Sequence, residues 1–408
     1  MSGTYGSTTT TLGSAIATKW KRDVIEGATG RLVGAKFAAT DAMKRGEGGT
    51  LVYNRILRPS LVNSSSTTGT LVAGGSSGIK SLTSNKVSVT PSLFQDSFGF
   101  DDDVTIEAFF SNGQYKESIK NQMAISLDYQ VVKMLSTQCL RHRIDADGTY
   151  QKAVTASAGT TTTSSFSGLL TEADDFWNGG YICVTNPDGP NYDHPARAIT
   201  DFATSGDVVT HAAFPTASTT ASKCRVTVGT GVVATDILPT TGLQDVLGLH
   251  DKLETEMFDD GYLRGFFDAA QHRDLLKDSV FLASMEYDNS EYFKGYRVRR
   301  WCGLEMLISS NLYREDVDGV EYGHGGAGTT GVCYVSPIFG RNAYALTPWG
   351  NGNGKFAVNW YIVDGADSYN LTANQHYISW KTFWGGTTLR STSVIGLMTG
   401  ATSQALLV

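Results

Sequence analysis

GQYKESIKNQMAISLDYQVVKMLSTQCLRHRI, residues 113–144, is the stretch that sets the architecture. No Pro or Gly interrupts it after Gly113, and Ser111 with Gln114 forms an S-x-x-Q capping box at its start. Its apolar residues recur four apart, which predicts a helix with one buried face. These residues are Ile119, Met123, Leu127, Val131, Leu135 and Cys139.

The predicted helix is long and positively charged at its end. At the usual helical rise it would measure about 45–50 Å, more than an ordinary globular helix. Arg141, His142 and Arg143 fall in its last turns, where cations suit the helix dipole. We therefore expect a strut against which several other elements pack.

The composition indicates a folded, β-rich protein that lives in contact with other chains. Of the 408 residues, 41% are hydrophobic and only 18% are charged, and Gly is frequent at 45. An intrinsically disordered chain would be less apolar and more charged. The net charge of −7 also excludes a general nucleic-acid binder.

The charge is uneven along the chain. Residues 1–60 hold nine Lys and Arg against four Asp and Glu, a balance of +5 that leaves −12 for the remainder. A basic amino-terminal arm suggests an intersubunit contact or a weakly DNA-facing segment. A solvated charge excess explains the same numbers, so both interpretations stay open.

The five Cys are scattered, odd in number and form no CxxC motif. This pattern predicts reduced core thiols in a protein made in a cytoplasm. The amino terminus does not have the pattern of a secretory signal. No apolar run approaches the ~20 residues that span a bilayer, so we expect no membrane contact.

A long polar excursion precedes the helix. Strands are predicted at residues 50–62 and 86–110, and the segment between them is Gly-rich and poor in bulky apolar residues. A two-stranded hairpin is only marginally stable alone in water. We expect the excursion to lie on a neighbouring subunit; the alternative is a floppy surface loop.

Residues 150–240 are predicted to form a small β-rich module, a possible insertion, and the rest a mixed α/β layer. The module strands are expected at residues 181–185, 196–202, 207–211 and 223–229. Helices are expected at 243–258 and, capped by Asp268, at 269–277. Further strands are expected at 261–267, 304–309, 332–335, 344–347, 356–363 and 376–383, with a strand or short helix at 389–398.

Motifs that carry chemistry are incomplete. Residues 74–78 match G-x-S-x-G but lack the buried strand and helix of a nucleophile elbow. Residues 229–234 match G-x-G-x-x-A, yet Pro239 truncates the helix that a dinucleotide site needs. Residues 350–355 lack the first glycine and final hydroxyl of a Walker motif, and the seven His show no metal spacing. We therefore expect no enzyme, cofactor or metal.

The order of the parts resembles the major capsid protein of tailed bacteriophages, the Hong Kong 97-like fold. Four stretches sharpen the resemblance toward the capsid family of Enquatro-type podoviruses. They are Gly48-Gly-Thr-Leu-Val-Tyr-Asn-Arg55, Phe258-Asp-Asp-Gly-Tyr262, Gly295-Tyr-Arg-Val-Arg-Arg-Trp-Cys-Gly-Leu-Glu-Met-Leu-Ile-Ser309 and Ile378-Ser-Trp-Lys-Thr-Phe-Trp-Gly385.

The resemblance implies an α+β fold divided into named regions. These are an N-arm (1–47), an E-loop (48–105), a spine helix with peripheral domain (106–149), the β-rich insertion (150–240), an axial domain (241–375) and a return strand (376–408). It also implies that assembly residues lie on the basic arm, the excursion and the spine face. They are Lys19, Lys21, Arg22, Arg55, Arg58, Lys80, Lys86, Ile119, Met123, Leu127 and Val131.

The expected function is that of an icosahedral shell protein, assembled in a host bacterial cytoplasm and resident in the virion. The expected partners are copies of itself in hexamers and pentamers, portal, scaffolding and decoration proteins, and double-stranded DNA held by non-specific contacts. An encapsulin-like compartment shell is the alternative with the same fold, and a phage-borne hydrolase is the alternative of another class.

Overall fold

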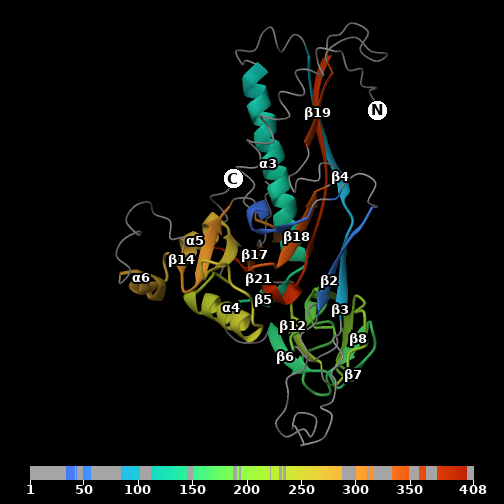
Figure 1. Ribbon diagram of the computed structural model, residues 1–408. Helices are drawn as coiled ribbons and strands as arrows, with labels where there is room; N and C mark the ends of the chain where they lie inside the picture. Colours follow the sequence, from blue (N-terminus) through green and yellow to red (C-terminus); the bar gives the residue numbers. More distant parts are fainter. Residues whose placement is uncertain are drawn as a thin grey trace, which may run out of the picture. The chain divides into compact units, whose positions relative to one another are not determined.

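The computed structural model shows a strand-rich α+β protein with few helices (Figure 1). It describes residues 34–41, 43, 49–56, 84–101, 112–144, 150–186, 191–192, 194–220, 222–228, 232, 236–286, 300–309, 312–315, 333–348, 358–363 and 375–401. The chain divides into two compact units. Unit 1 holds Met1–Val52, Ser88–Val131 and Tyr344–Thr387, and unit 2 holds Tyr53–Val87, Val132–Ala343 and Thr388–Val408.

Unit 1 joins a helix to a sheet of long strands. The helix α3, Asn112–Thr137, runs beside strands β4, β19 and β20 (Figure 1). The sheet has the order β1-β18-β20-β19, with β4 also paired to β20. Its strands are β1 (Ala39–Thr40), β4 (Ser92–Asp101), β18 (Tyr344–Pro348), β19 (Val358–Val363) and β20 (Gln375–Thr388). A 3-10 turn, η1 (Gly34–Phe37), precedes β1.

The longest ladder in unit 1 joins segments far apart in sequence. β4 pairs antiparallel with β20 from Ser92 opposite Trp384 to Asp101 opposite Gln375. Phe94 stacks on Trp384 at 5.1 Å between ring centroids, the kind of cross-strand aromatic contact that stabilises a sheet. The predicted strands at 86–110, 356–363 and 376–383 are thus confirmed over the described residues, with residues 102–110 outside them.

The predicted helix 113–144 is wrong at its carboxyl end. α3 ends at Thr137, and Leu140–Arg143 forms the strand β5, in which all four residues are buried. β5 pairs in parallel with β21 (Val394–Thr399), so Arg141, His142 and Arg143 do not lie in helical turns. Pairing with a strand more than 250 residues away overrides the local helical periodicity. Ser111 of the predicted capping box lies outside the described residues.

A second sheet forms the body of unit 2. Its order is β14-β15-β13-β17-β21-β5, with β16 also paired to β17. The remaining strands are β13 (Leu263–Phe267), β14 (Arg300–Trp301), β15 (Leu304–Ile308), β16 (Arg314–Glu315) and β17 (Cys333–Phe339), and η3 (Ser391–Ser393) leads into β21. β13, β17 and β21 are buried along their whole length, which places the core of the body here.

Three helices accompany the body sheet: α4 (Thr240–Lys252), α5 (Ala269–Leu275) and α6 (Ser279–Glu286). The predicted cap is confirmed, because Asp268 and Gln271 form a complete capping box at α5. The predicted helix 243–258 is wrong at both ends. The observed helix α4 begins at Thr240, because Asp278 accepts hydrogen bonds from Thr240 N and Oγ1. It ends at Lys252, because Glu254 adopts a positive φ of 50° that does not continue the helix.

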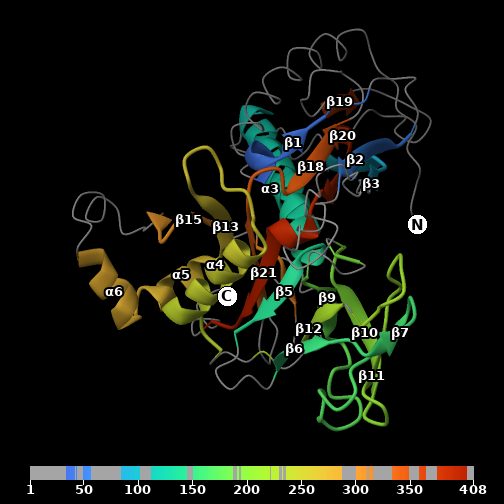
Figure 2. The ribbon, with the colours of Figure 1, turned by 60° about the horizontal axis from the view of Figure 1, so that its bottom comes forward.

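The third sheet is a module made of one continuous stretch of chain (Figure 2). Its order is β6-β12-β9-β10-β11-β8-β7. The strands are β6 (Gln151–Thr155), β7 (Ala158–Gly159), β8 (Thr163–Ser165), β9 (Tyr181–Val184), β10 (Arg197–Ala203), β11 (Val208–His211) and β12 (Lys223–Thr227). All four strands predicted between residues 181 and 229 are present. The module has its own apolar cluster around the fully buried Trp177.

Candidate functional site

The four apolar residues predicted to form an assembly face on the spine helix lie in the interior of unit 1. Ile119, Met123, Leu127 and Val131 are at most 7% exposed. These side chains therefore pack inside unit 1, and their role in assembly stays a prediction. Ile125, which the periodicity argument passed over, is an apolar residue of α3 that is 43% exposed.

A buried polar contact fixes the segment before β1 to α3. Asp128 Oδ1 accepts a hydrogen bond of 2.8 Å from Gly34 N, and Tyr344 Oη donates to the Gly34 carbonyl. A methyl group on Gly34 would lie 3.0 Å from Val131 Cγ1, so a larger residue here would force the Val131 side chain to shift. Burial, with the Asp128 charge in support, raises the pKa of Tyr344. The sequence hint for this contact is Asp128 itself, an acidic residue next to the buried Leu127 in a mostly apolar stretch of the helix.

Replacing Asp128 with Ala is expected to destabilise unit 1 by about 1–3 kcal/mol, because the buried Gly34 N–H loses its acceptor. Asp128→Asn is the matched control, since its amide oxygen can still accept this bond. The measurement is chemical denaturation followed by exchange protection of the η1 amides. Equal stability of the Ala and Asn variants would contradict the assignment.

Most of the predicted basic assembly residues cannot be placed. Lys19, Lys21, Arg22, Arg58 and Lys80 lie outside the described residues.

Arg55 belongs to β2 (Leu51–Ile56), but its side chain is outside the description. Lys86 is exposed on β3 (Ser84–Val89). The role of these basic residues in assembly stays a prediction.

β2 and β3 form a two-stranded sheet at the base of the predicted excursion. Within the described part of the chain, neither strand pairs with a third one. Val52 is 46% exposed and lies between the partly buried Leu51 and Tyr53. Among the described strands, none extends the ribbon at either edge, and Val52 adds an exposed apolar side chain to it.

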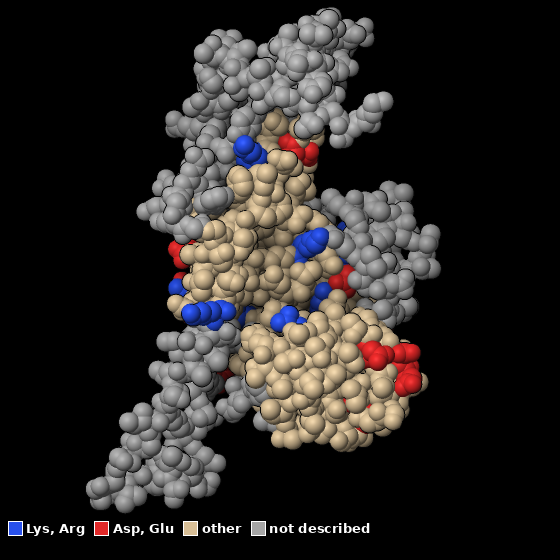
Figure 3. Space-filling model, turned by 90° about the vertical axis from the view of Figure 1, so that its right-hand side faces the viewer, with Lys and Arg blue, Asp and Glu red and all other residues tan. Residues whose placement is uncertain are grey.

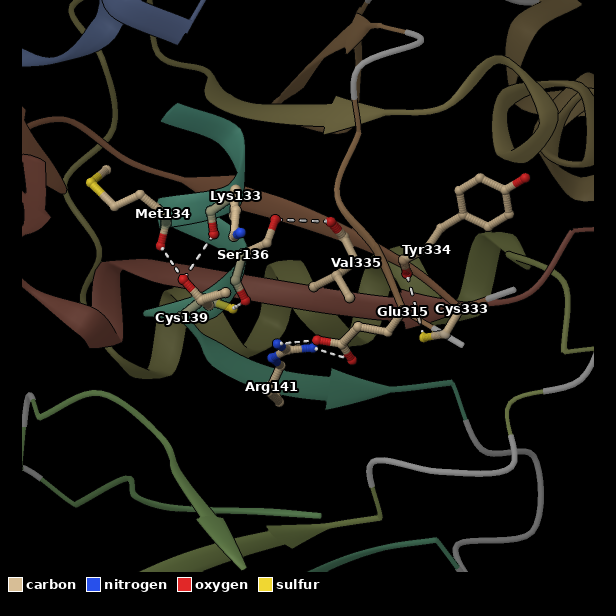
Figure 4. Close-up of polar contacts among 10 residues, drawn as sticks. Lys133, Met134, Ser136, Cys139, Arg141, Glu315, Cys333, Tyr334 and Val335 are labelled. Carbon is tan, nitrogen blue, oxygen red and sulfur yellow. Dashed lines mark hydrogen bonds and ion pairs between the residues drawn. The ribbon is translucent and has the colours of Figure 1, made fainter. Parts of the chain in front are cut away.

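A charged network fills the interior of unit 2 beside β5 (Figure 4). Arg141 binds Glu315 in a two-bond pair, with Nη1 to Oε2 at 3.2 Å and Nη2 to Oε1 at 2.8 Å. Both side chains are at most 2% exposed. Ser136 Oγ donates to the Val335 carbonyl at 3.2 Å next to this pair. This two-bond pair links β5 to β16, although the two strands are not neighbours in the sheet.

The thiols of the chain do not resemble catalytic nucleophiles. Four Cys are buried, and burial raises the pKa of Cys139 to about 11 and of Cys333 to about 12. A thiol with a raised pKa carries little thiolate and reacts slowly. Cys302 is exposed in the tight turn between β14 and β15. Partial loss of solvent around its thiol still raises its pKa.

The described residues contain no group of three His, Cys, Asp or Glu placed to hold a metal ion. No helix that the structure describes is long and apolar enough to cross a membrane. The G-x-S-x-G match at 74–78 and the Gly-rich loop at 350–355 lie outside the described residues, as does most of the match at 229–234.

Positive charge is dispersed on the face drawn in Figure 3. Isolated Lys and Arg side chains lie among uncharged residues, and the part of this face that is described shows no continuous basic field. Tight binding of double-stranded DNA requires many simultaneous phosphate contacts.

Comparison with known proteins gave no sequence match and several structural likenesses. No family model matches the chain, and no curated protein matches it significantly. It is similar to a solved structure of Mycobacterium phage Che8, with 11% identity, a TM-score of 0.45, and coverage of 88% of this chain and 91% of that one.

Two further similar structures are capsids of cyanophages. The P-SCSP1u capsid matches with 11% identity, a TM-score of 0.47 and 89% coverage of both chains. The Pam1 capsid asymmetric unit matches with 10% identity, a TM-score of 0.48 and 90% coverage of both chains.

Proposed function

We propose that this protein is the structural subunit of a closed icosahedral shell, the head of a tailed bacteriophage that encloses double-stranded DNA. The observation that carries the proposal is the β2–β3 ribbon, whose two backbone edges find no further strand among the described residues. A two-stranded ribbon is only marginally stable in water. We therefore infer that it packs against a surface outside the described part of its own fold.

The long helix and sheet of unit 1 supply the rigid part that a shell subunit needs. One face of α3 is buried, and η1 is fastened to it by Asp128. β4 keeps ten residues paired with β20, so the segment that follows the ribbon is held along its length. A subunit of this kind transmits a fixed geometry from one contact to the next.

The mechanism of the proposed function is geometric rather than chemical. Each subunit would meet its fellows around five-fold and six-fold axes through heterologous contacts that close into rings. The excursion would lie on a neighbour and protect its own edges. Many modest contacts would then add by avidity. DNA would be confined by the closed shell, which is compatible with a net charge of −7.

Electron microscopy and light scattering of the purified chain test the proposal. Closed particles or rings of five and six subunits would support it. A subunit that stays monomeric in the presence of the scaffolding and portal proteins encoded beside it would refute it. Nuclease-protected DNA in particles from infected cells separates a phage head from a compartment shell that hosts proteins.

Deleting residues 63–85 is expected to abolish shell closure while the subunit stays folded, because the deletion removes the tip of the excursion and shortens β3. The measurements are particle counts by microscopy and circular dichroism of the free subunit. The matched control keeps the length and composition of residues 63–85 and shuffles their order. Normal particles from the deleted chain would contradict the role of the excursion.

A further inference from the structure

β5 packs inside unit 2 against one face of the module strands β9 and β12. The opposite face of these strands carries Ile182, Val184, Cys224 and Val226 of the module core. Because side chains alternate along a strand, the residues between them face β5. We call this contact the module seam; its residues on the module side include Tyr181, Cys183 and Arg225.

Two arginines of β5 have partners at the module seam. The Arg141 guanidinium lies 4.4 Å from the Tyr181 ring centroid in addition to its pair with Glu315. The Arg143 guanidinium lies 4.1 Å from the Tyr150 ring centroid and 3.5 Å from Asp236 Oδ2. Each buried guanidinium thus has one aromatic ring and one carboxylate that stabilise its charge.

His142 lies between these arginines in sequence, but its side chain is on the opposite face of β5, the face of Leu140, which shares a core cluster with Cys183 of the seam. His142 is 4% exposed, and its Nδ1 has no hydrogen-bond partner among the described residues. Arg225 Nη1 also has none there, and the acid that acts on Arg225 is Asp245 of α4. Burial, and after it the Arg225 charge, lower the pKa of His142 to about 3. The seam therefore holds this imidazole only in its neutral form.

We propose that the module seam is an acid-opened joint: proton uptake by His142 separates β5 from β9 and β12 while the module keeps its own fold. A solvated His142 in the open seam would regain an ordinary pKa of about 6.5. Between that value and about 3 the open form binds more protons, so acid favours opening.

The size of the effect follows from the same two values. The equilibrium constant for opening should rise about tenfold for each pH unit below about 6.5. It should be roughly 30-fold larger at pH 5 than at pH 7.5. Arg225 keeps its charge throughout this range, so a proton added to His142 meets a cation on the module side of the seam.

Two cysteines of the module report on the joint independently. Cys183 faces the seam, whereas Cys224 on the neighbouring strand faces the module core, and both are buried. The experiment labels the full-length protein with an aromatic disulfide reagent at about pH 7.5 and about pH 5. Mass spectrometry then gives the rate at each cysteine, divided by the rate of glutathione at the same pH.

The expected result is a roughly 30-fold relative rise at Cys183 with Cys224 still protected. His142→Gln should remove the rise, because its amide takes up no proton in this range. Arg225→Gln should leave the rise nearly unchanged, because burial, the larger cause of the lowered pKa, remains. His142→Asn serves as the second variant if His142→Gln does not fold. His211→Gln is the matched control, since His211 is buried inside the module away from the seam.

Three outcomes would overturn the proposal. One is a constant relative rate at Cys183 in the wild type. Another is a joint rise of Cys183 and Cys224, which would mean that the module itself unfolds. The last is an undiminished rise in a folded His142→Gln protein.

Discussion

Replacing Arg141 with Met should lower the free energy of unfolding of unit 2 by about 3–5 kcal/mol, because Glu315 is left as an unpaired charge at 1% exposure. The stability is lost mainly because the Glu315 carboxylate stays buried without a partner, and less because its attraction to Arg141 is gone. The double variant Arg141→Met/Glu315→Leu removes both charges and should therefore recover most of the loss. Denaturant unfolding of the three proteins gives the values.

The matched control is the ion pair between Arg341 and Asp259, whose side chains are 44% and 85% exposed. Arg341→Met should change the stability by no more than about 1 kcal/mol, because water solvates the remaining carboxylate. A double variant at the buried pair that is as unstable as Arg141→Met would contradict this account. The defect would then be one of packing around β5.

Replacing Trp177 with Ala should cost about 3–5 kcal/mol, the range for truncating a fully buried aromatic residue. Trp177 lies in the module core, its ring contacts Phe176 edge to face at 5.1 Å, and its Nε1 donates to Glu172 Oε2 at 3.2 Å. Since the module has a separate apolar cluster, the damage should be confined to it.

Hydrogen exchange measures this confinement. Amides of β10 and β11 should lose protection in Trp177→Ala, while those of β17 and β21 in the body keep theirs. Leu169→Ala is the control within the module, because Leu169 is 47% exposed and its truncation should be nearly neutral. Equal loss of protection in the module and the body would show that unit 2 unfolds as one cooperative block.

Local signals predicted the elements whose stability is local. The module strands β6, β7 and β8 were not predicted. The other four module strands are bounded by turn residues, and Asp268 carries its capping partner Gln271 three positions along. Both could be read from the sequence because the residues that decide them are neighbours in the chain.

The errors occurred where distant residues decide the structure. Leu140–Arg143 continues the helical pattern of α3, but its backbone pairs with β21. The start of α4 depends on Asp278, 38 positions away from Thr240. The periodicity of α3 predicted its buried face correctly, but a periodic pattern does not show what buries that face.

The two ends of the module are neighbours in its own sheet. β6 and β12 pair antiparallel with Gln151 opposite Thr227, and Val228 N donates to the Tyr150 carbonyl at 2.8 Å. The chain thus departs and returns at points about 5 Å apart. In genetic terms the coding segment of the module could be exchanged as one piece, because its two ends encode residues that are neighbours in the fold. A foreign domain whose termini lie equally close could be grafted there if it also covers β5, which packs on β9 and β12.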